Sequence, residues 1–317
     1  MTRRFYVTTP IYYVNGAPHI GHAYTSIAAD VMARFHRLAG HDVFFLTGTD
    51  EHGQKVEQAA QAAGVEPQVF VDRIAADFRD MADAMAISYD DFIRTTEPRH
   101  VAGAQALWER VAQNDAIYLG AYEGWYALRD ECFYGEDELT TGPDGQKLAP
   151  TGAPVEWVKE PSYFFRLSAF QDRLLELYEQ CPEFLGPHGA RNEIISFVRQ
   201  GLRDLSISRT SFKWGIPVPG DEAHVMYVWF DALANYLSAL GFPDTNSARA
   251  AYWPADLHLV GKDIARFHAI YWPAFLMAAG IDVPRRIFAN GWWTIEGQKM
   301  SKSIGNVIDP RDLVREF

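Results

Sequence analysis

Residues 5–47, FYVTTPIYYVNGAPHIGHAYTSIAADVMARFHRLAGHDVFFLT, contain two strand patterns with a helix pattern between them. Aromatic and β-branched residues at Phe5–Thr9 predict a strand that a proline ends. Apolar residues then recur at steps of three and four, which predicts a helix from Ile20 that ends near Gly40. Asp42–Thr47 is typical of a short buried strand. Strand, helix and strand in this order form a βαβ unit, so we expect a parallel sheet with this helix as its crossover.

The rest of the chain indicates where this α/β pattern is interrupted. Residues 1–113 continue it with further helices and a third strand. Between 114 and 221, alternating aromatic residues and a Gly/Pro turn indicate an inserted domain. The pattern returns over 222–297, and 298–317 holds a polar loop and the start of another helix. We therefore predict an α/β fold: a Rossmann-like, doubly wound parallel sheet split by an inserted domain.

Three segments of the second half carry specific predictions. The aromatic run Val225–Phe230 is typical of a strand. Apolar residues over Asp263–Ala279 predict a helix. Asp309 and Pro310 are a good N-cap and first-turn pair, so we expect a last helix to begin there.

Composition limits the classes of function. The 317 residues are 48% hydrophobic and 22% charged, which is typical of a compact globular enzyme. The net charge of −12 opposes a general polyanion-binding surface but leaves room for a local basic patch. Cys132 and Cys181 are too few for a disulfide framework or a four-cysteine metal site, and they suit a reducing compartment. Since neither a signal peptide nor a membrane-spanning stretch is visible, we expect a cytoplasmic protein without membrane contact.

Two histidines mark the junction between the first strand and the first helix. In His19-Ile20-Gly21-His22 they share one helix face, where the N–H groups of a helix N-terminus attract phosphate. Both imidazoles can donate to one polyphosphate, and Gly21 lets a ligand approach the backbone. For the tetrapeptide alone, a capping His19 and a surface or core His22 are an equal alternative. Zinc binding by the pair is a weaker one, because no third ligand stands at metal spacing.

Two lysines lie near the other end of the chain, in Lys299-Met300-Ser301-Lys302-Ser303. Small and polar neighbours indicate a mobile loop that can deliver positive charge. Lysines that close as charge develops on phosphate oxygens stabilise the transition state more than the ground state. A solvated basic loop is the usual alternative for an isolated pair, but here both motifs occur in one chain.

Together the two motifs resemble the signatures of the class I aminoacyl-tRNA synthetases. More narrowly, the chain resembles the methionyl-tRNA synthetase family over essentially its whole length. The segments that carry this narrower resemblance are Thr8–Gly16, Thr47–Gly53, Tyr227–Leu233 and Gly261–His268.

The resemblance implies a two-step reaction. Methionine and ATP give methionyl-adenylate and pyrophosphate, after which the methionyl group passes to the acceptor end of tRNA(Met). Mg²⁺ accompanies ATP. The implied catalytic residues are His19, His22, Lys299 and Lys302. The implied ATP-binding residues are His19, Gly21, His22, Gly261, Asp263, Lys299 and Lys302.

The resemblance also implies a methionine pocket. Its residues are Ile11, Tyr13, Asp50, Trp229, Ala232, Tyr236, Ile264 and His268. Aromatic rings make favourable contacts with a thioether, and Asp50 would receive the substrate ammonium. Without the resemblance, Trp229 fits core packing better and Asp50 fits a cap for the next helix.

The insertion departs from a pattern common in the family. Many relatives carry a zinc knuckle with paired cysteines there, whereas this chain has Ala127 and Asp130 at the first pair and lacks the second around 149–152. Cys132 alone cannot supply four ligands. We therefore expect no structural zinc. The insertion is also too short for a separate editing domain of the isoleucyl, valyl or leucyl type.

Other functions are less well supported. A small-molecule adenylyltransferase is disfavoured by the insertion and the chain length, and a silent tRNA-binding relative by the two intact motifs. A dinucleotide-dependent oxidoreductase is poorly supported, because this chain has no G-x-G-x-x-G motif after the first strand. The helix expected at Pro310 is too short to be stable alone. We therefore expect a catalytic fragment without the family's anticodon-binding domain, which would make no anticodon contacts.

Overall fold

The computed structural model describes residues 2–291, 294–295, 298–299 and 308–316. Its centre is a seven-stranded sheet. The strands are β1 (Arg4–Thr8), β2 (Tyr12–Tyr13), β3 (Asp42–Asp50), β4 (Asp91–Arg94), β10 (Leu185–Gly186), β15 (Leu257–Gly261) and β16 (Ile287–Asn290). The strand pairs in this sheet are parallel, so the predicted parallel α/β sheet is confirmed.

The order of the strands creates a switch point. Leu46 of β3 pairs with Thr8 of β1 and with Asp91 of β4, so β1 and β4 lie on opposite edges of β3. On its other side β1 pairs with β15, and β15 pairs with β16. The chain therefore runs outward from β1 in one direction and outward from β15 in the other. In sheets of this kind a crevice opens at the carboxyl ends of the two strands where the order reverses.

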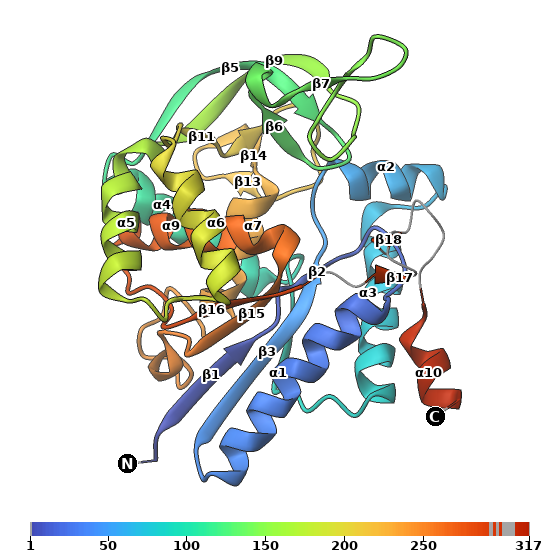
Figure 1. Cartoon of the computed structure of the whole chain (residues 1–317), viewed down its shortest axis with the longest axis vertical. Coiled ribbons are helices and arrows are strands. Elements are labelled where there is room, and N and C mark those ends of the chain that lie inside the picture. The colour runs from blue at the N-terminus through green and yellow to red at the C-terminus, as the bar shows by residue number, and fades with distance from the viewer. Residues whose placement is uncertain (1, 292–293, 296–297, 300–307, 317) are drawn as a thin grey trace.

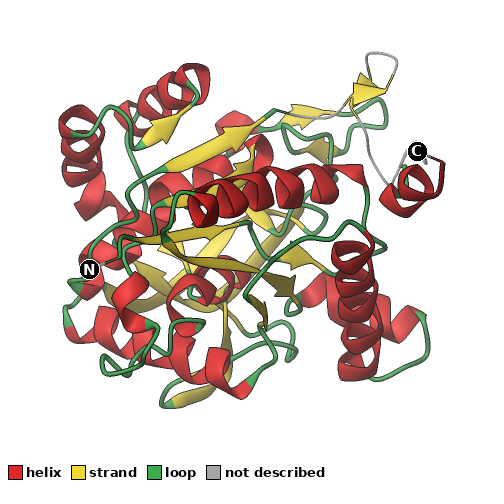
Figure 2. Cartoon of the chain, turned by 90° about the horizontal axis from the view of Figure 1, so that it is seen from below, coloured by secondary structure: helices red, strands yellow, loops and turns green. Residues whose placement is uncertain are grey.

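Helices cover both faces of the sheet, as Figure 2 shows. The alternation along β1 explains this arrangement. Phe5 and Val7 pack with Ala29 and Ala33 of α1 (Ile20–Leu38), which is the predicted crossover from β1 to β3. Tyr6 points the other way, into a larger core with residues of α4 (Pro98–Gln113) and α9 (Trp272–Ala279).

Several large apolar residues of α1 face outward, although Met32 packs against the core. Val31, Phe35 and Leu38 are 59%, 61% and 90% exposed, and Ile27 is 41% exposed. Alanines on the opposite side allow the helix backbone to approach the sheet closely. The three- and four-residue spacing thus predicted the helix, but it marks an exposed stripe and not a core-facing one.

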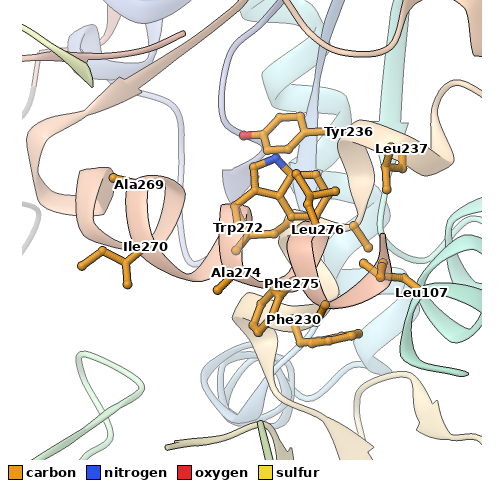
Figure 3. Close-up of a cluster of buried hydrophobic side chains, with 14 of the residues drawn as sticks. Leu107, Phe230, Tyr236, Leu237, Ala269, Ile270, Trp272, Ala274, Phe275 and Leu276 are labelled. Carbon is orange, nitrogen blue, oxygen red and sulfur yellow. The ribbon is translucent and has the colours of Figure 1, made fainter. Parts of the chain in front are cut away.

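The larger core joins α4 and α9 to α7 (Val228–Leu233) and α8 (Asn235–Ser238), as Figure 3 shows. Phe230 is fully buried, with its ring 4.8 Å from that of Phe275 and 5.2 Å from that of Trp108. The prediction of a strand over Val225–Phe230 is therefore wrong beyond β14 (Asp221–Met226). Burial against α4 and α9 outweighs the strand preference of these aromatic residues.

The predicted helix over Asp263–Ala279 is broken. It divides into a 3₁₀ turn η4 (Lys262–Ile264), a π-helical turn η5 (Phe267–Tyr271) and α9. Pro273 has no amide proton, so the regular hydrogen-bond ladder fails near it, and single π turns are frequent at functional sites. α9 ends at Gly280, which adopts φ +65°.

The predicted insertion forms a second, antiparallel sheet. β5 (Ile117–Ala127), β6 (Cys132–Tyr134), β9 (Glu156–Phe165) and β11 (Leu205–Ser206) lie in the order β11-β9-β5-β6. Figure 1 shows its two long paired strands, β5 and β9, at the top of the molecule. β10 lies within 114–221 in sequence and nevertheless adds an edge strand to the main sheet. The boundaries at 113, 221 and 297 remain predictions.

A small apolar cluster occupies the region of the insertion where the family pattern would place cysteines. Ala127, Ala149, Ala153 and Val155 are buried together. The Asp130 carboxylate accepts hydrogen bonds from Thr151 and, at 3.0 Å, from the Tyr134 hydroxyl. Within the part of the chain that the structure describes, no three His, Cys, Asp or Glu residues are grouped so that they could hold a metal ion.

The remaining elements lie mostly at the periphery. They are α2 (Gln54–Ala62), α3 (Pro67–Ala84), η1 (Glu136–Glu138), β7 (Thr140–Thr141), β8 (Lys147–Leu148), η2 (Leu167–Phe170), α5 (Gln171–Gln180), α6 (His188–Arg199), β12 (Ser208–Arg209), β13 (Pro217–Val218), η3 (Ala250–Tyr252), β17 (Thr294–Ile295), β18 (Gln298–Lys299) and α10 (Pro310–Glu316). The predicted last helix is thus α10, with Asp309 Oδ1 accepting from the Arg311 amide at 2.8 Å. Among the helices of the described residues, none combines the length and the apolar character needed to cross a bilayer.

Candidate functional site

A cavity of about 1180 Å³ opens at the carboxyl ends of β1 and β15. It is large enough for two small ligands, since sites for single drug-sized molecules usually span about 300–1,000 Å³. Every predicted site residue whose side chain or glycine backbone is described lines it: Ile11, Tyr13, His19, Gly21, His22, Asp50, Trp229, Ala232, Tyr236, Gly261, Asp263, Ile264 and His268. The side chain of Lys299 and the whole of Lys302 lie outside the described residues.

The two histidines cap the N-terminus of α1 in a reciprocal way. His19 Nδ1 accepts from the Gly21 amide at 3.1 Å, and His22 Nδ1 accepts from the His19 amide at 3.0 Å. The rings stack with their centroids 3.7 Å apart. Because each Nδ1 accepts a hydrogen bond, the proton of each neutral ring lies on Nε2. The first turn of α1 contains no acidic residue, so this end of the helix favours an anion.

The segments on both sides of the lysine motif meet this helix end. Before the motif, Asn290 at the end of β16 accepts from the Thr25 hydroxyl at 3.4 Å, and Asn290 also lines the cavity. After it, the Ile308 carbonyl accepts from the Ile20 amide at 3.1 Å. Two segments that are distant in sequence from α1 thus lie against its first turns.

Asp50 ends β3 at the wall of the cavity. Asp50 is only 7% exposed, and its Oδ1 has no hydrogen-bond partner among the described residues. Burial raises the pKa of this carboxyl well above its usual range, and the charges of Asp231, Glu131 and Glu51 add to the effect. A buried carboxyl group with an unused acceptor fits a cationic group of a ligand.

An aromatic wall faces the same space. Trp229 stacks on Phe267 with a centroid distance of 3.8 Å. The Ile264 carbonyl accepts from His268 Nδ1 at 3.0 Å, so Nε2 is free of a proton and accepts from the Tyr236 hydroxyl at 2.7 Å. Burial lowers the pKa of His268 to about 4, which keeps the ring neutral at physiological pH. The wall is therefore uncharged and suits an apolar side chain with a weakly polar atom.

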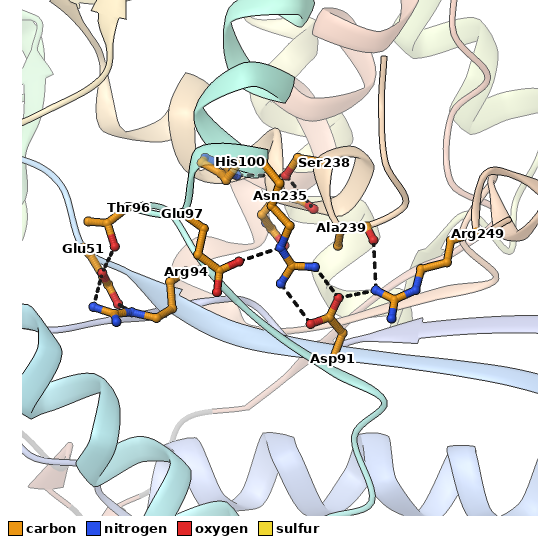
Figure 4. Close-up of polar contacts among 11 residues, drawn as sticks. Glu51, Asp91, Arg94, Thr96, Glu97, His100, Asn235, Ser238, Ala239 and Arg249 are labelled. Carbon is orange, nitrogen blue, oxygen red and sulfur yellow. Dashed lines mark hydrogen bonds and ion pairs between the residues drawn. The ribbon is translucent and has the colours of Figure 1, made fainter. Parts of the chain in front are cut away.

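Two residues after Trp229 of the aromatic wall, a buried carboxylate connects three segments of the chain. Asp231 of α7 is fully buried and contacts His52 Nδ1 at 2.6 Å and His100 Nε2 at 2.7 Å. Burial opposes its charge, but the two histidines outweigh burial and lower the pKa of Asp231 to about 2. His100 also contacts the Ser238 hydroxyl at 2.9 Å, as Figure 4 shows. This network links α4 and α8 to the segment directly after Asp50.

A second polar cluster supports the end of β3. The fully buried Glu51 carboxylate accepts from Arg94 Nε at 2.6 Å and from Nη2 of the same residue at 2.9 Å. The Thr96 hydroxyl donates to it at 2.6 Å, and Figure 4 shows this group of three. Bidentate charge-assisted bonds of this kind hold a backbone segment rigidly.

Sequence reasoning missed several residues of the cavity wall. Phe267 stands beside His268 in a segment that the family resemblance already included, so its place could have been found. Asn290 and Glu131 follow no motif and reach the cavity only through the fold. The cavity thus combines an acceptor for a cation, an uncharged aromatic wall and an anion-attracting helix end.

Comparisons with known proteins agree with this arrangement. The family model described as tRNA synthetases class I (M) matches residues 5–317. The methionine–tRNA ligase of Rickettsia bellii (strain RML369-C) is 63% identical over all 317 residues, which correspond to 62% of that protein. That of Mesorhizobium japonicum is 60% identical over 314 residues and 61% of its length. The chain therefore spans about three fifths of the curated relatives that it matches.

Solved structures give the same picture. The methionyl-tRNA synthetase of Mycobacterium tuberculosis in complex with methionyl-adenylate is 56% identical, with a TM-score of 0.97 over 100% of this chain and 62% of that one. Its free-state structure is 53% identical, with a TM-score of 0.80 over 92% of this chain and 56% of that one.

Proposed function

Because the chain belongs to the family of class I tRNA synthetases (M), we propose that it joins L-methionine and ATP into methionyl-adenylate and releases pyrophosphate. The observation that carries this proposal is the buried Asp50 oxygen, which finds no hydrogen-bond partner in the described part of the chain and shares one cavity with the histidine-capped end of α1. The carboxyl group suits the ammonium of an amino acid, and the helix end suits the phosphates of a nucleoside triphosphate.

Methionine would bind with its charged and apolar ends in different surroundings. Asp50 would receive the ammonium group, whose positive charge stabilises the ionised form of this carboxyl. The thioether side chain lies against Ile11, Tyr13, Trp229, Ala232, Tyr236, Ile264 and His268. Sulfur makes favourable contacts with aromatic rings, and the Tyr236–His268 pair is neutral, so an apolar side chain is accepted and a charged one is not.

ATP would bind across the switch point. The Nε2 protons of His19 and His22 would face the phosphate chain, and Gly21 would let the nucleotide approach the backbone, while Gly261 and Asp263 would hold the nucleoside side of the site. Mg²⁺ bound to the ATP phosphates would neutralise part of their charge. The described residues offer no cluster of three ligating side chains that would hold the metal alone.

The reaction needs positioning and charge stabilisation more than a protein nucleophile. A methionine carboxylate oxygen attacks the α-phosphorus, and the bond from that phosphorus to the pyrophosphate oxygen breaks. Negative charge grows on the phosphate oxygens as this happens, so the histidine donors, with Lys299 and Lys302, stabilise the transition state. The flanks of the lysine motif, Asn290 and Ile308, contact α1, and this supports a closing role for the loop.

The second step would transfer the methionyl group to the acceptor end of tRNA(Met). This step is supported by the names of the relatives, which are methionine–tRNA ligases. The chain spans about three fifths of their length. Anticodon contacts are not part of the proposal for residues 1–317.

Amino-acid-dependent ATP–pyrophosphate exchange, measured with each of the twenty amino acids in turn, tests the proposal. We expect exchange with methionine and at most traces with leucine or isoleucine. Exchange that prefers leucine would overturn the proposed specificity. No exchange with any amino acid would overturn the activity itself and favour a silent relative.

A further inference from the structure

Glu131 is a buried carboxylate that the proposed reaction does not use. It lies in the tight connection between β5 and β6, in the predicted insertion, and is 7% exposed. Its backbone adopts φ +48°, a conformation that residues other than glycine take up rarely. Its side chain nevertheless reaches out of the insertion to the wall of the main cavity.

One carboxylate oxygen of Glu131 holds two groups of the catalytic half. The Tyr13 hydroxyl donates to Oε1 at 2.7 Å, and the Lys55 amide donates to the same atom at 3.3 Å. Lys55 is in the first turn of α2, whose N-cap residue is Gly53 and has no side chain to cap with. The insertion therefore supplies a side-chain acceptor at this helix N-terminus, in addition to Glu57 in the first turn.

Gly53 leaves room for this contact. A Cβ atom there would lie 2.9 Å from Glu131 Oε1 and 3.0 Å from the Tyr13 hydroxyl oxygen, and the residue adopts φ +109°. Any side chain at position 53 would thus be strained and would displace the Tyr13–Glu131 pair. The glycine and the carboxylate are matched to each other in shape.

Three further contacts fix the same junction. The Tyr227 hydroxyl donates to the Glu131 carbonyl at 2.9 Å. Lys55 Nζ donates to the Arg129 carbonyl at 2.7 Å and lies 5.1 Å from the centre of the Tyr13 ring. Both ends of the β5–β6 connection are therefore tied to residues of the catalytic half.

We propose that Glu131 is a positioning residue through which the insertion holds Tyr13 in place as a wall of the methionine pocket. This inference rests on the proposed function, in which Tyr13 contacts methionine. Its consequence is specific: loss of the Glu131–Tyr13 bond weakens methionine binding and leaves ATP binding unchanged. Burial raises the pKa of the Glu131 carboxyl, and its charge, when ionised, adds to the burial that raises the pKa of Asp50.

Methionine-dependent ATP–pyrophosphate exchange tests this in Glu131→Ala, Glu131→Gln, Tyr13→Phe and the double variant Tyr13→Phe/Glu131→Ala. We expect Glu131→Ala and Tyr13→Phe each to raise KM for methionine by about tenfold and to change KM for ATP by less than about twofold. The double variant will be no worse than Glu131→Ala, because the two changes remove one interaction. Glu131→Gln keeps an acceptor oxygen and will lose less.

A matched tyrosine–carboxylate pair provides the control. Tyr118 donates to Asp204 Oδ2 at 2.9 Å within the insertion, and neither residue lines the cavity. We expect Tyr118→Phe and Asp204→Ala to keep both KM values within about twofold of the wild type, even where they lower Tm.

The outcomes separate the inference from the function. Wild-type KM for methionine in Glu131→Ala and Tyr13→Phe, or fully additive effects in the double variant, would overturn the inference alone. If Glu131→Ala does not fold, as judged by circular dichroism, Tyr13→Phe decides by the same criterion. A wild-type chain without exchange would overturn the proposed function and this inference with it.

Discussion

Asp50 is the residue on which the proposed recognition of the amino acid depends. It is buried and its Oδ1 is unpartnered among the described residues, an arrangement that is costly in the free protein. Functional sites often retain such costs, because the missing partner arrives with the ligand. The free energy lost in the empty site is thus recovered when an ammonium group binds.

Asp50→Asn should weaken methionine activation. The substitution removes the charge but keeps the shape, so the ammonium of bound methionine loses a charge-assisted hydrogen bond. We expect kcat/KM for methionine in pyrophosphate exchange to fall about 100-fold, or about 3 kcal/mol, with KM for ATP little changed. A variant within about threefold of wild type would contradict this role.

The same substitution should stabilise the empty protein in a pH-dependent way. Burial first, and then the charges of Asp231, Glu131 and Glu51, raise the pKa of Asp50 above 3.8. The folded state therefore binds more protons, and the stability of the wild type falls as the pH rises from 3.8 through the raised pKa. We expect Asp50→Asn to have the higher Tm near pH 7 and the difference to shrink toward about pH 4. A lower Tm for the variant near pH 7 would contradict the assignment.

Among the residues of the cavity, those that belong to a sequence motif were predicted, and those outside any motif were missed. His19, His22, Asp50 and Trp229 stand in segments with a recognisable order, and all four line the cavity. Glu131 reaches the same cavity from the insertion, 118 residues after Tyr13, and its contact depends on a glycine with φ +109°. Such a contact follows only from the three-dimensional path of the chain.

The N-terminus of α1 is the element that the phosphate chain would meet. Its two histidines each cap the helix with Nδ1 and keep the Nε2 proton directed away from the cap. In the proposed function, the capping task and the catalytic task would thus be divided between the two nitrogens of one ring. A substitution that replaces only the Nδ1 acceptor can test the capping task apart from the task of Nε2.

His19→Asn should keep the cap and lose the donor. The asparagine Oδ1 can accept from the Gly21 amide in place of Nδ1, so we expect Tm to stay within about 2 °C of wild type. No donor remains at the position of Nε2, and kcat for exchange should fall about 100-fold or more while KM for methionine holds. His19→Ala, as control, should also lose about 1 kcal/mol of stability with the cap. Equal loss of stability in both variants would contradict the division of tasks.

Elements with regular periodicity were predictable, and elements shaped by distant contacts were not. β1, α1 and β3 follow from short apolar runs and a helical period. α7 begins within a run that prefers strands, because Phe230 packs between Phe275 and Trp108. The π-helical turn η5 places His268 opposite Tyr236, and only the proline at 273 hinted that the helix would be irregular.

The whole molecule brings segments that are distant in sequence to the N-terminus of α1. The first βα turn and the segments on either side of 291–307 lie together because β1 and β15 are neighbours at the switch point. The parallel sheet and the inserted domain were predicted from sequence. That the insertion also caps α2 and lends an edge strand to the main sheet was not.

Lys302→Ala should slow the chemical step without weakening methionine binding. The lysine would meet the phosphate only as negative charge grows, so we expect kcat for exchange to fall about 100-fold while the Kd for methionine, measured by tryptophan fluorescence, changes less than about twofold. Lys147→Ala, which removes a lysine paired with Glu136 in the insertion, is the control and should match wild type in both. A Lys302→Ala protein with wild-type kcat would contradict the closing role.

A crystal structure of the chain with a non-hydrolysable methionyl-adenylate analogue, the methionyl sulfamoyl adenosine, would show where the cavity holds each part of its ligand. We expect the ligand ammonium about 3 Å from an Asp50 oxygen, the thioether against Trp229 and Tyr236, and the sulfamoyl group beside His19 and His22. A ligand bound outside this cavity, or inside it with its ammonium directed at the α1 N-terminus, would overturn the proposed recognition of methionine and ATP.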